Sequence, residues 1–229
     1  MICQPIAYIH NDFPTKFGLP RQSGMAEHLL SRIVMAEEYR NPEAFRGIEA
    51  FEYLWLIWEF EPMGKRAWSP TVRPPKLGGN RRMGVFATRS PNRPNSLGLT
   101  RVRLVKAELH TPQGPVLHVA GADLMSGTAI FDIKPYLPFA DSVPDAAAGD
   151  YGPQTQTPLN VVIHPDVAAL FDKEQLDTLR EVLPYDPRPG YQSDESRDYG
   201  FAYSGYDIRF YVKGDTLTVT HAVPLKDSE

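Results

Sequence analysis

The chain of 229 residues has one cysteine, Cys3, which excludes an internal disulfide, and its place near the terminus argues against a catalytic thiol. The six histidines are scattered without the spacing of zinc ligands, so we expect no metal site. No apolar run approaches the roughly 18 residues that a membrane helix needs. The first residues also lack the basic-then-apolar layout of a secretion signal, and we expect a cytoplasmic protein.

Several nucleotide and acyl-transfer motifs are also absent. There is no G-x-G-x-x-G after a strand, no G-x-x-x-x-G-K-[ST] and no G-x-S-x-G. These absences exclude the Rossmann type of nucleotide site, the P-loop and the commonest acyl-transfer signature. What the chain does contain is 22 prolines and 17 glycines, which indicate a β-rich molecule with many turns, and its 42% hydrophobic content suffices for a packed core.

Positive charge is concentrated in one part of the chain. The segment 62–107 has eleven Lys and Arg and no Asp or Glu, whereas the other residues carry 13 basic against 28 acidic side chains. Such segregation is typical of a protein whose field attracts a polyanion. A basic face that pairs with acidic residues of the C-terminal part is an equally good explanation of the charge alone.

The order of residues within this basic segment predicts two short strands joined by a stiff loop. Residues 84–88 and 99–105 have the pattern of strands, and the connection from Arg89 to Gly98 contains Pro91 and Pro94. Because proline fixes φ, we expect Arg89 and Arg93 to be held in set directions. A rigid loop that carries arginines suits recognition of a carboxylate or a phosphate.

The remaining pattern predicts a mainly β fold with a small α+β C-terminal part. Six or so evenly spaced strands indicate a barrel. Besides the strand at 84–88, we expect strands at residues 1–10, 51–60, 99–109, 115–120 and 128–134. The run 51–60 is apolar on both faces and predicts a fully buried strand. We expect a barrel domain at 1–140, a linker or mobile loop at 141–157, and a C-terminal domain at 158–229 with two helical patterns and a closing hairpin at 207–212 and 216–220.

A family resemblance extends over nearly the whole chain. The segments PRQSG (20–24), RGIEAFEYLWLIWEF (46–60), RPPKLGGN (73–80), MGVFATRSPNRPN (83–95), DLMSGTAIFDIKPYLPFADS (123–142) and DPRPGY (186–191) together resemble the tRNA N6-threonylcarbamoyladenosine methyltransferases, in the same order. The resemblance implies a single-sheeted β-barrel that binds S-adenosylmethionine, a short C-terminal domain and a homodimer. It also implies methyl transfer to N6 of the modified adenosine next to the anticodon.

The resemblance implies a cofactor pocket built from short segments far apart in sequence. Its expected residues are Pro20, Arg21, Gln22, Glu61, Pro62, Arg89, Leu99, Asp123, Leu124, Met125 and Ser126. Arg89 would hold the methionyl carboxylate and Asp123 would accept ribose hydroxyls or the amino group. An exposed turn is the alternative for 20–22, and a salt bridge within the barrel is the alternative for Arg89. Ser126 and the pair at 61–62 depart from the family pattern, as do Ser96 and Leu97.

Basic residues outside this pocket are expected to contact tRNA phosphates, which supply affinity with little sequence choice. They are Arg73, Lys76, Arg81, Arg82, Arg93 and Lys134, and solvated surface charge is the alternative for them. Trp68 or Tyr136 would offer a ring on which an anticodon-loop base can stack. Two other functions fit parts of this pattern: a non-catalytic RNA-binding barrel, and a methyltransferase that acts on a protein or a small metabolite.

Overall fold

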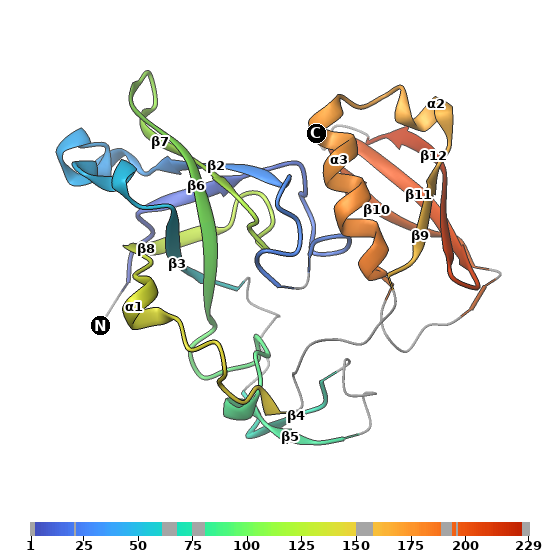
Figure 1. The fold of residues 1–229 in the computed structure, drawn as a ribbon, viewed down its shortest axis with the longest axis horizontal. Coiled ribbons are helices and arrows are strands. Elements are labelled where there is room, and N and C mark those ends of the chain that lie inside the picture. Colours follow the sequence, from blue (N-terminus) through green and yellow to red (C-terminus); the bar gives the residue numbers. More distant parts are fainter. Residues whose placement is uncertain are drawn as a thin grey trace.

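The protein combines a β-barrel with a separate four-stranded sheet. The computed structural model describes residues 3–20, 22–60, 68–74, 81–149, 158–188, 194–195 and 197–225. Strands between residues 7 and 135 close the barrel, and strands between residues 160 and 224 form the second sheet beside it (Figure 1). The predicted fold class, mainly β with a small α+β C-terminal part, is confirmed. The division of the chain into domains at 141–157 stays a prediction.

The barrel strands follow the order β1-β2-β7-β6-β3-β8, and each neighbouring pair is antiparallel. Their bounds are β1 Ala7–His10, β2 Leu30–Met35, β3 Tyr53–Glu59, β6 Leu97–Thr111, β7 Gly114–Ala120 and β8 Ala129–Pro135. Three 3₁₀ turns connect β2 to β3, at Glu37–Tyr39, Pro42–Phe45 and Ile48–Ala50. Closure leaves the barrel without an open edge between β1 and β8.

The two faces of strand β3 differ in burial. Leu54, Leu56 and Trp58 are buried in the barrel core, whereas Tyr53 and Trp55 lie on the outer surface and are partly exposed. The prediction that both faces are buried is therefore wrong. Aromatic side chains on the outer face made the run look continuously apolar, although its period is that of a strand with one buried face.

Two other sequence predictions in the barrel need correction. Residues 84–88 are not one strand, because β5 (Met83–Gly84) pairs with β4 (Thr71–Val72) and then gives way to a 3₁₀ turn at Val85–Ala87. The hydroxyl of Thr88 donates to the carbonyl of Val85 and closes this turn. Strand β2 was not predicted, because the polar Ser31 occupies one of its buried positions and hides the alternation.

The C-terminal sheet has the order β10-β11-β12-β9, with β9 parallel to β12. The elements after the barrel are α1 Pro138–Asp141, β9 Asn160–Ile163, α2 Pro165–Ala168, α3 Lys173–Val182, a 3₁₀ turn at Leu183–Tyr185, β10 Tyr199–Tyr203, β11 Tyr206–Lys213 and β12 Thr216–Pro224. The predicted hairpin is confirmed as β11 and β12, whereas β9 and β10 were not predicted. A capping box between Asp172 and Gln175 begins α3, which packs against the sheet through Leu179 and Val182.

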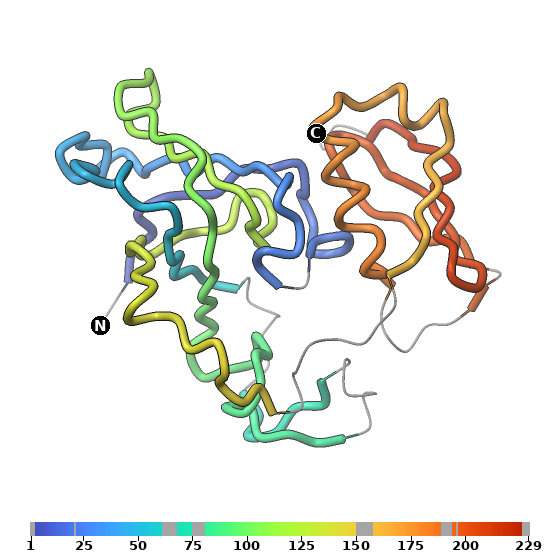
Figure 2. The backbone as a smooth tube through the Cα atoms, in the orientation of Figure 1, coloured from blue at the N-terminus to red at the C-terminus, as the bar shows by residue number. Residues whose placement is uncertain are grey.

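The connection between β1 and β2 joins the two parts of the molecule. Its residues Phe13, Ala26 and Leu29 belong to the hydrophobic core of the C-terminal sheet rather than to that of the barrel. The ring centroid of Phe13 lies 4.8 Å from that of Tyr203. Figures 1 and 2 show this connection beside α3, where the carbonyl of His28 accepts a hydrogen bond from Thr178 at 3.0 Å.

Candidate functional site

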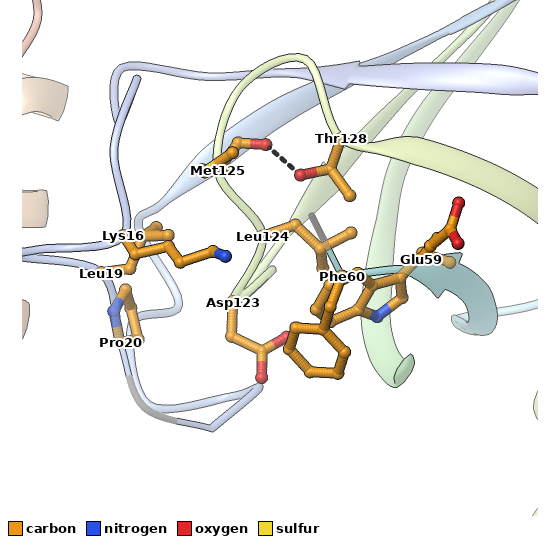
Figure 3. A pocket seen from close by; sticks show the side chains of 10 residues that line it. Lys16, Leu19, Pro20, Glu59, Phe60, Asp123, Leu124, Met125 and Thr128 are labelled. Atoms are coloured by element: carbon orange, nitrogen blue, oxygen red, sulfur yellow. Dashed lines mark hydrogen bonds between the residues drawn. The ribbon is translucent and has the colours of Figure 1, made fainter. Parts of the chain in front are cut away.

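A cleft of about 520 Å³ opens where β3 ends and β6 begins. Its walls come from the β1–β2 connection, from β3, from the loop at 88–96, from the start of β6 and from the loop after β7. A smaller pocket of about 170 Å³ adjoins it and shares Pro20, Trp58, Phe60 and Asp123 with it. Figure 3 shows how side chains from these separate segments surround the smaller pocket. The larger volume lies within the range of about 300–1,000 Å³ that is usual for small-molecule sites.

A chain of hydrogen bonds runs from the barrel core to the Asp123 carboxylate. The indole Nε1 of Trp58 donates to Oγ1 of Thr100 at 2.9 Å, and Thr100 donates to Oδ1 of Asp123 at 2.7 Å. Because the Trp58 N–H can only donate, it leaves the Thr100 proton to point at Asp123. Trp58 and Thr100 are themselves buried, at 7% and 1% exposure, so the carboxylate is held by a rigid support.

The Asp123 carboxylate is set apart electrostatically from an ordinary surface aspartate. Burial raises the pKa of Asp123 above its usual value of 3.8. The hydrogen bond from Thr100, backbone N–H groups of Asp123 and Ser23, and the positive charge of Arg89 act in the opposite direction but do not cancel the effect of burial. A desolvated acid that faces a cleft is a frequent feature of ligand sites.

Arg89 lies across the cleft from the loop that follows β1. Its Nη1 donates to Oε1 of Gln22 at 2.8 Å, and both residues line the cleft. Arg89 is exposed and makes no salt bridge within the part of the chain that the structure describes. A salt bridge within the barrel, the alternative considered for Arg89, is therefore not found among the described residues. The guanidinium lines the cleft and has further N–H groups that can donate to a ligand.

Most predicted cofactor residues that the structure describes meet at these two pockets. Pro20, Gln22, Arg89, Leu99 and Asp123 line the larger one, and Leu124 and Met125 line the smaller one. Ser126 lines neither pocket; its hydroxyl accepts the N–H of Asn11 at 3.3 Å and its own N–H donates to the Phe13 carbonyl. Arg21, Glu61 and Pro62 lie outside the described residues.

The predicted RNA contacts are more dispersed. Arg73, Arg81 and Arg82 are exposed near β4 and β5, whereas Lys76 lies outside the described residues. Lys134 pairs with Asp132 at 2.7 Å.

Arg93 lines the cleft, but its Nη1 donates to the carbonyls of Val85 and Thr88 at 3.2 and 2.7 Å. This arginine therefore fastens the loop that carries Arg89. Trp68 is 50% exposed and its ring centroid lies 6.5 Å from that of Phe86.

Several cleft residues were not predicted from the sequence. Trp55, Trp58, Thr100 and Arg101 all line the cleft. Thr100 could have been singled out from the sequence, because it is a polar residue at a position of β6 where the alternation predicts a buried apolar side chain. Such a residue needs a hydrogen-bond partner inside the barrel. The partner, Asp123, is 23 residues away and only the fold brings the two together.

Within the described part of the chain, no cluster of three or more His, Cys, Asp or Glu side chains could hold a metal ion. The expectation that the protein has no metal site stays a prediction. No helix among the described residues is long and apolar enough to cross a membrane.

Comparison with known proteins identifies the family. The model of the tRNA-methyltransferase O N-terminal domain matches residues 8–142, and that of the TrmO C-terminal domain matches residues 156–225. The chain belongs to the tRNA-methyltransferase O family. A relative from Escherichia coli strain K12, the tRNA (adenine(37)-N6)-methyltransferase, is 37% identical over 91% of this chain and 92% of its own. A relative from Pseudomonas aeruginosa with S-adenosylmethionine-dependent methyltransferase in its name is 36% identical over 94% of each chain.

The fold agrees with that of a solved family member. The crystal structure of TrmO from P. aeruginosa superimposes with a TM-score of 0.78 at 27% identity and covers 97% of both chains. The predicted family and the predicted β-barrel are therefore confirmed. The chain is a tRNA methyltransferase of the TrmO type, as the sequence predicted.

Proposed function

We propose that this methyltransferase uses S-adenosylmethionine to methylate N6 of the threonylcarbamoyl-modified adenosine beside the anticodon of tRNA. The observation that carries the proposal is the cleft at the barrel mouth, where Arg89 and the supported Asp123 carboxylate face the same space. The name of the E. coli relative supports adenine N6 as the target atom. The motifs of the basic segment and the DPRPGY segment support the modified base, through the family resemblance.

The residues of the two pockets fit S-adenosylmethionine. That molecule has an amino-acid end with a carboxylate, two ribose hydroxyls and a flat apolar purine. The cleft offers the Arg89 guanidinium for the carboxylate, the Asp123 carboxylate for hydroxyl donors, and Trp58, Phe60 and Leu99 as apolar walls. The smaller pocket has mostly apolar walls and suits the purine better than the charged end. When bound, the cofactor supplies a methyl group that is already activated by a sulfonium.

The residues of this chain therefore have to bind, orient and keep water out, rather than activate an electrophile. Arg89 and Asp123 fix two separated points of the cofactor, and two fixed points define an orientation. Alignment of the reacting atoms can supply about 7–11 kcal/mol of the barrier. Gln22 keeps the Arg89 guanidinium directed by accepting one of its N–H groups, so the arginine is ordered before the ligand arrives.

One experiment tests both the cofactor and the modified base. The purified protein is incubated with S-adenosylmethionine and either tRNA that carries threonylcarbamoyladenosine or the same tRNA lacking that group, and nucleosides are analysed by mass spectrometry. We expect the methylated product with the first tRNA only. Equal methylation of both would refute the requirement for the modified base, and no methylation of either would refute the reaction. A chelator should leave cofactor binding unchanged when heat release is followed in a titration.

We also propose a cytoplasmic homodimer, for which the family resemblance is the main support. Phe139 and Val143, which follow the barrel, are 88% and 69% exposed. A second copy of the chain that covered these two side chains would remove apolar surface from water. Sedimentation of the wild type and of a Phe139→Ser variant tests the assembly, and a monomeric wild type would contradict it.

A further inference from the structure

Three neighbouring barrel strands carry a grid of aromatic and basic side chains on their outer surface. Strand register places Arg101, Trp55 and Lys134 in one row across β6, β3 and β8. Arg103 is opposite Tyr53 in the next row, where the Tyr136 N–H donates to the Tyr53 carbonyl at 2.9 Å. We call these six residues the outer aromatic face: Tyr53, Trp55, Arg101, Arg103, Lys134 and Tyr136.

The three rings and the Arg101 guanidinium of this face already contact one another. The guanidinium carbon of Arg101 lies 5.1 Å from the Tyr53 ring centroid and 5.6 Å from that of Tyr136. The Tyr136 ring lies 5.7 Å from that of Trp55 and 6.1 Å from that of Tyr53. All three rings remain partly open to solvent. A preformed cluster of tilted and edge-on aromatic rings, with one guanidinium beside two of them, is thus present on the outside of the barrel.

The charges of the outer aromatic face favour an anionic ligand. Arg101 and Arg103 form no ion pair with any residue that the structure describes, and Lys134 pairs with Asp132. One further acidic side chain touches the face, since the Asp141 carboxylate of α1 accepts the Trp55 indole N–H at 3.0 Å. A phosphate would supply the negative charge that these two arginines lack among the described residues.

The outer aromatic face is continuous with the cleft. Trp55 and Arg101 belong to both, because each lines the cleft and takes part in the ring contacts. A nucleotide chain that delivers one base to the cleft would have its neighbours directly above this face. Single-stranded RNA is commonly bound in this way, with bases stacked on aromatic rings or on arginine planes and with phosphates near basic side chains.

We propose that the outer aromatic face binds the nucleotides that flank the target adenosine. Bases would stack on Tyr136 and Tyr53, and Arg103 would contact a phosphate. This inference rests on the proposed function for its RNA substrate, but it adds a surface that the cofactor does not touch. Aromatic rings beside the arginines, on a surface continuous with the cleft, match the bases and phosphates of RNA and favour it over a second copy of this chain as the ligand.

A tyrosine on another strand of the same barrel provides the matched control. Tyr136→Ala is compared with Tyr8→Ala, since Tyr8 is 40% exposed on β1 and lies outside the outer aromatic face. The affinity for tRNA is measured by fluorescence anisotropy, and the affinity for S-adenosylmethionine by calorimetry. We expect Tyr136→Ala to bind tRNA about 5-fold to 150-fold more weakly, because stacking contributes about 1–3 kcal/mol per base. Tyr8→Ala should bind as the wild type does, and cofactor affinity should change in neither variant.

A second pair of variants tests the charge, and a conservative variant tests the ring. Arg103→Ala should weaken tRNA binding and flatten the dependence of log K on log salt by about 0.7, whereas Arg32→Ala, exposed on β2, should not. Tyr136→Trp should restore the affinity that Tyr136→Ala loses, because a larger ring still stacks. Failure of this rescue would assign Tyr136 a structural role and overturn the inference.

The remaining outcomes separate this inference from the proposed function. Equal tRNA affinities of Tyr136→Ala and Tyr8→Ala would overturn the inference while leaving the methylation reaction intact. A wild type that binds tRNA through Tyr136 but does not methylate it would support the inference and refute the proposed reaction. A change of oligomeric state in Tyr136→Ala, seen by sedimentation without any direct loss of RNA affinity, would overturn the inference by showing that a second copy of the chain covers this face.

Discussion

Substitution of Asp123 by asparagine should raise the stability of the folded protein at higher pH and at the same time weaken the binding of the cofactor. Burial raises the pKa of this carboxyl, so the folded protein binds its proton more tightly than the unfolded chain does. The stability that this group contributes is complete below the unfolded value, close to 3.8, and is lost as the pH rises through the folded pKa. Asparagine has nearly the same shape and does not titrate. The variant should therefore gain stability relative to the wild type as the pH rises.

The size of this effect follows from the linkage between protons and folding. Each unit by which the folded pKa exceeds the unfolded one corresponds to about 1.4 kcal/mol. In a chain of this length, about 1 kcal/mol moves the melting temperature by about 2–4 °C. The difference in melting temperature between Asp123→Asn and the wild type should thus shift by about 3–6 °C per pKa unit. At neutral pH the same variant should bind S-adenosylmethionine at least about 10-fold more weakly, because hydrogen bonds to a charged group contribute about 1.5–3 kcal/mol.

Scanning calorimetry from about pH 4 to about pH 8 measures the first effect, and titration calorimetry measures the second. Asp145→Asn, an exposed residue outside the cleft, controls for the removal of one negative charge. The reasoning would be refuted if the difference in melting temperature did not vary with pH, or if the variant lost stability as the pH rose. Unchanged cofactor affinity would remove Asp123 from the binding site.

Three further substitutions test other parts of the site. Arg89→Ala should abolish cofactor binding in a calorimetric titration, and detectable binding of normal affinity would exclude this arginine from the site. Arg81→Ala combined with Arg82→Ala should leave cofactor binding intact but flatten the salt dependence of tRNA binding by about 0.7–0.9 for each phosphate that is no longer bound; an unchanged slope would mean that these two are only solvated charges. Gly98→Ala should destabilise the barrel by about 1–3 kcal/mol, because a Cβ there would overlap the Trp58 ring. Denaturant unfolding measures this cost, and a stability equal to that of the wild type would contradict the packing described for Trp58.

The sequence allowed the strands with strong local patterns to be predicted, but not those whose patterns depend on the fold. The β7 and β8 strands and the β11–β12 hairpin follow turn signals and alternation and lie close to the expected positions. Strand β2 was hidden by Ser31, a polar residue that is only 3% exposed. The strand expected at 84–88 failed because hydrogen bonds of Thr88 close a turn that a short apolar run cannot reveal.

The candidate site was predictable mainly through family motifs. Those motifs pointed to Arg89 and Asp123, which the fold brings to one cleft, and to Ser126, which lines neither pocket and stays a prediction. The hydrogen bonds from Trp58 to Thr100 and from Thr100 to Asp123 connect β3, β6 and the loop after β7. Their spacing in the sequence does not predict these contacts. Relations between side chains that are distant in sequence are what the fold adds to such motifs.

The packing of the β1–β2 connection has a consequence for how this protein can be divided or recombined. Phe13, Ala26 and Leu29 come from the barrel half of the sequence but complete the core of the C-terminal sheet. A chain cut after residue 157 would leave this apolar surface bare, and the same connection carries Pro20 and Gln22 to the cleft. Exchange of C-terminal parts between relatives would therefore have to include residues 13–29 of the donor. The structural unit that can be exchanged intact consists of the C-terminal sheet and the β1–β2 connection, two segments that are far apart in the gene.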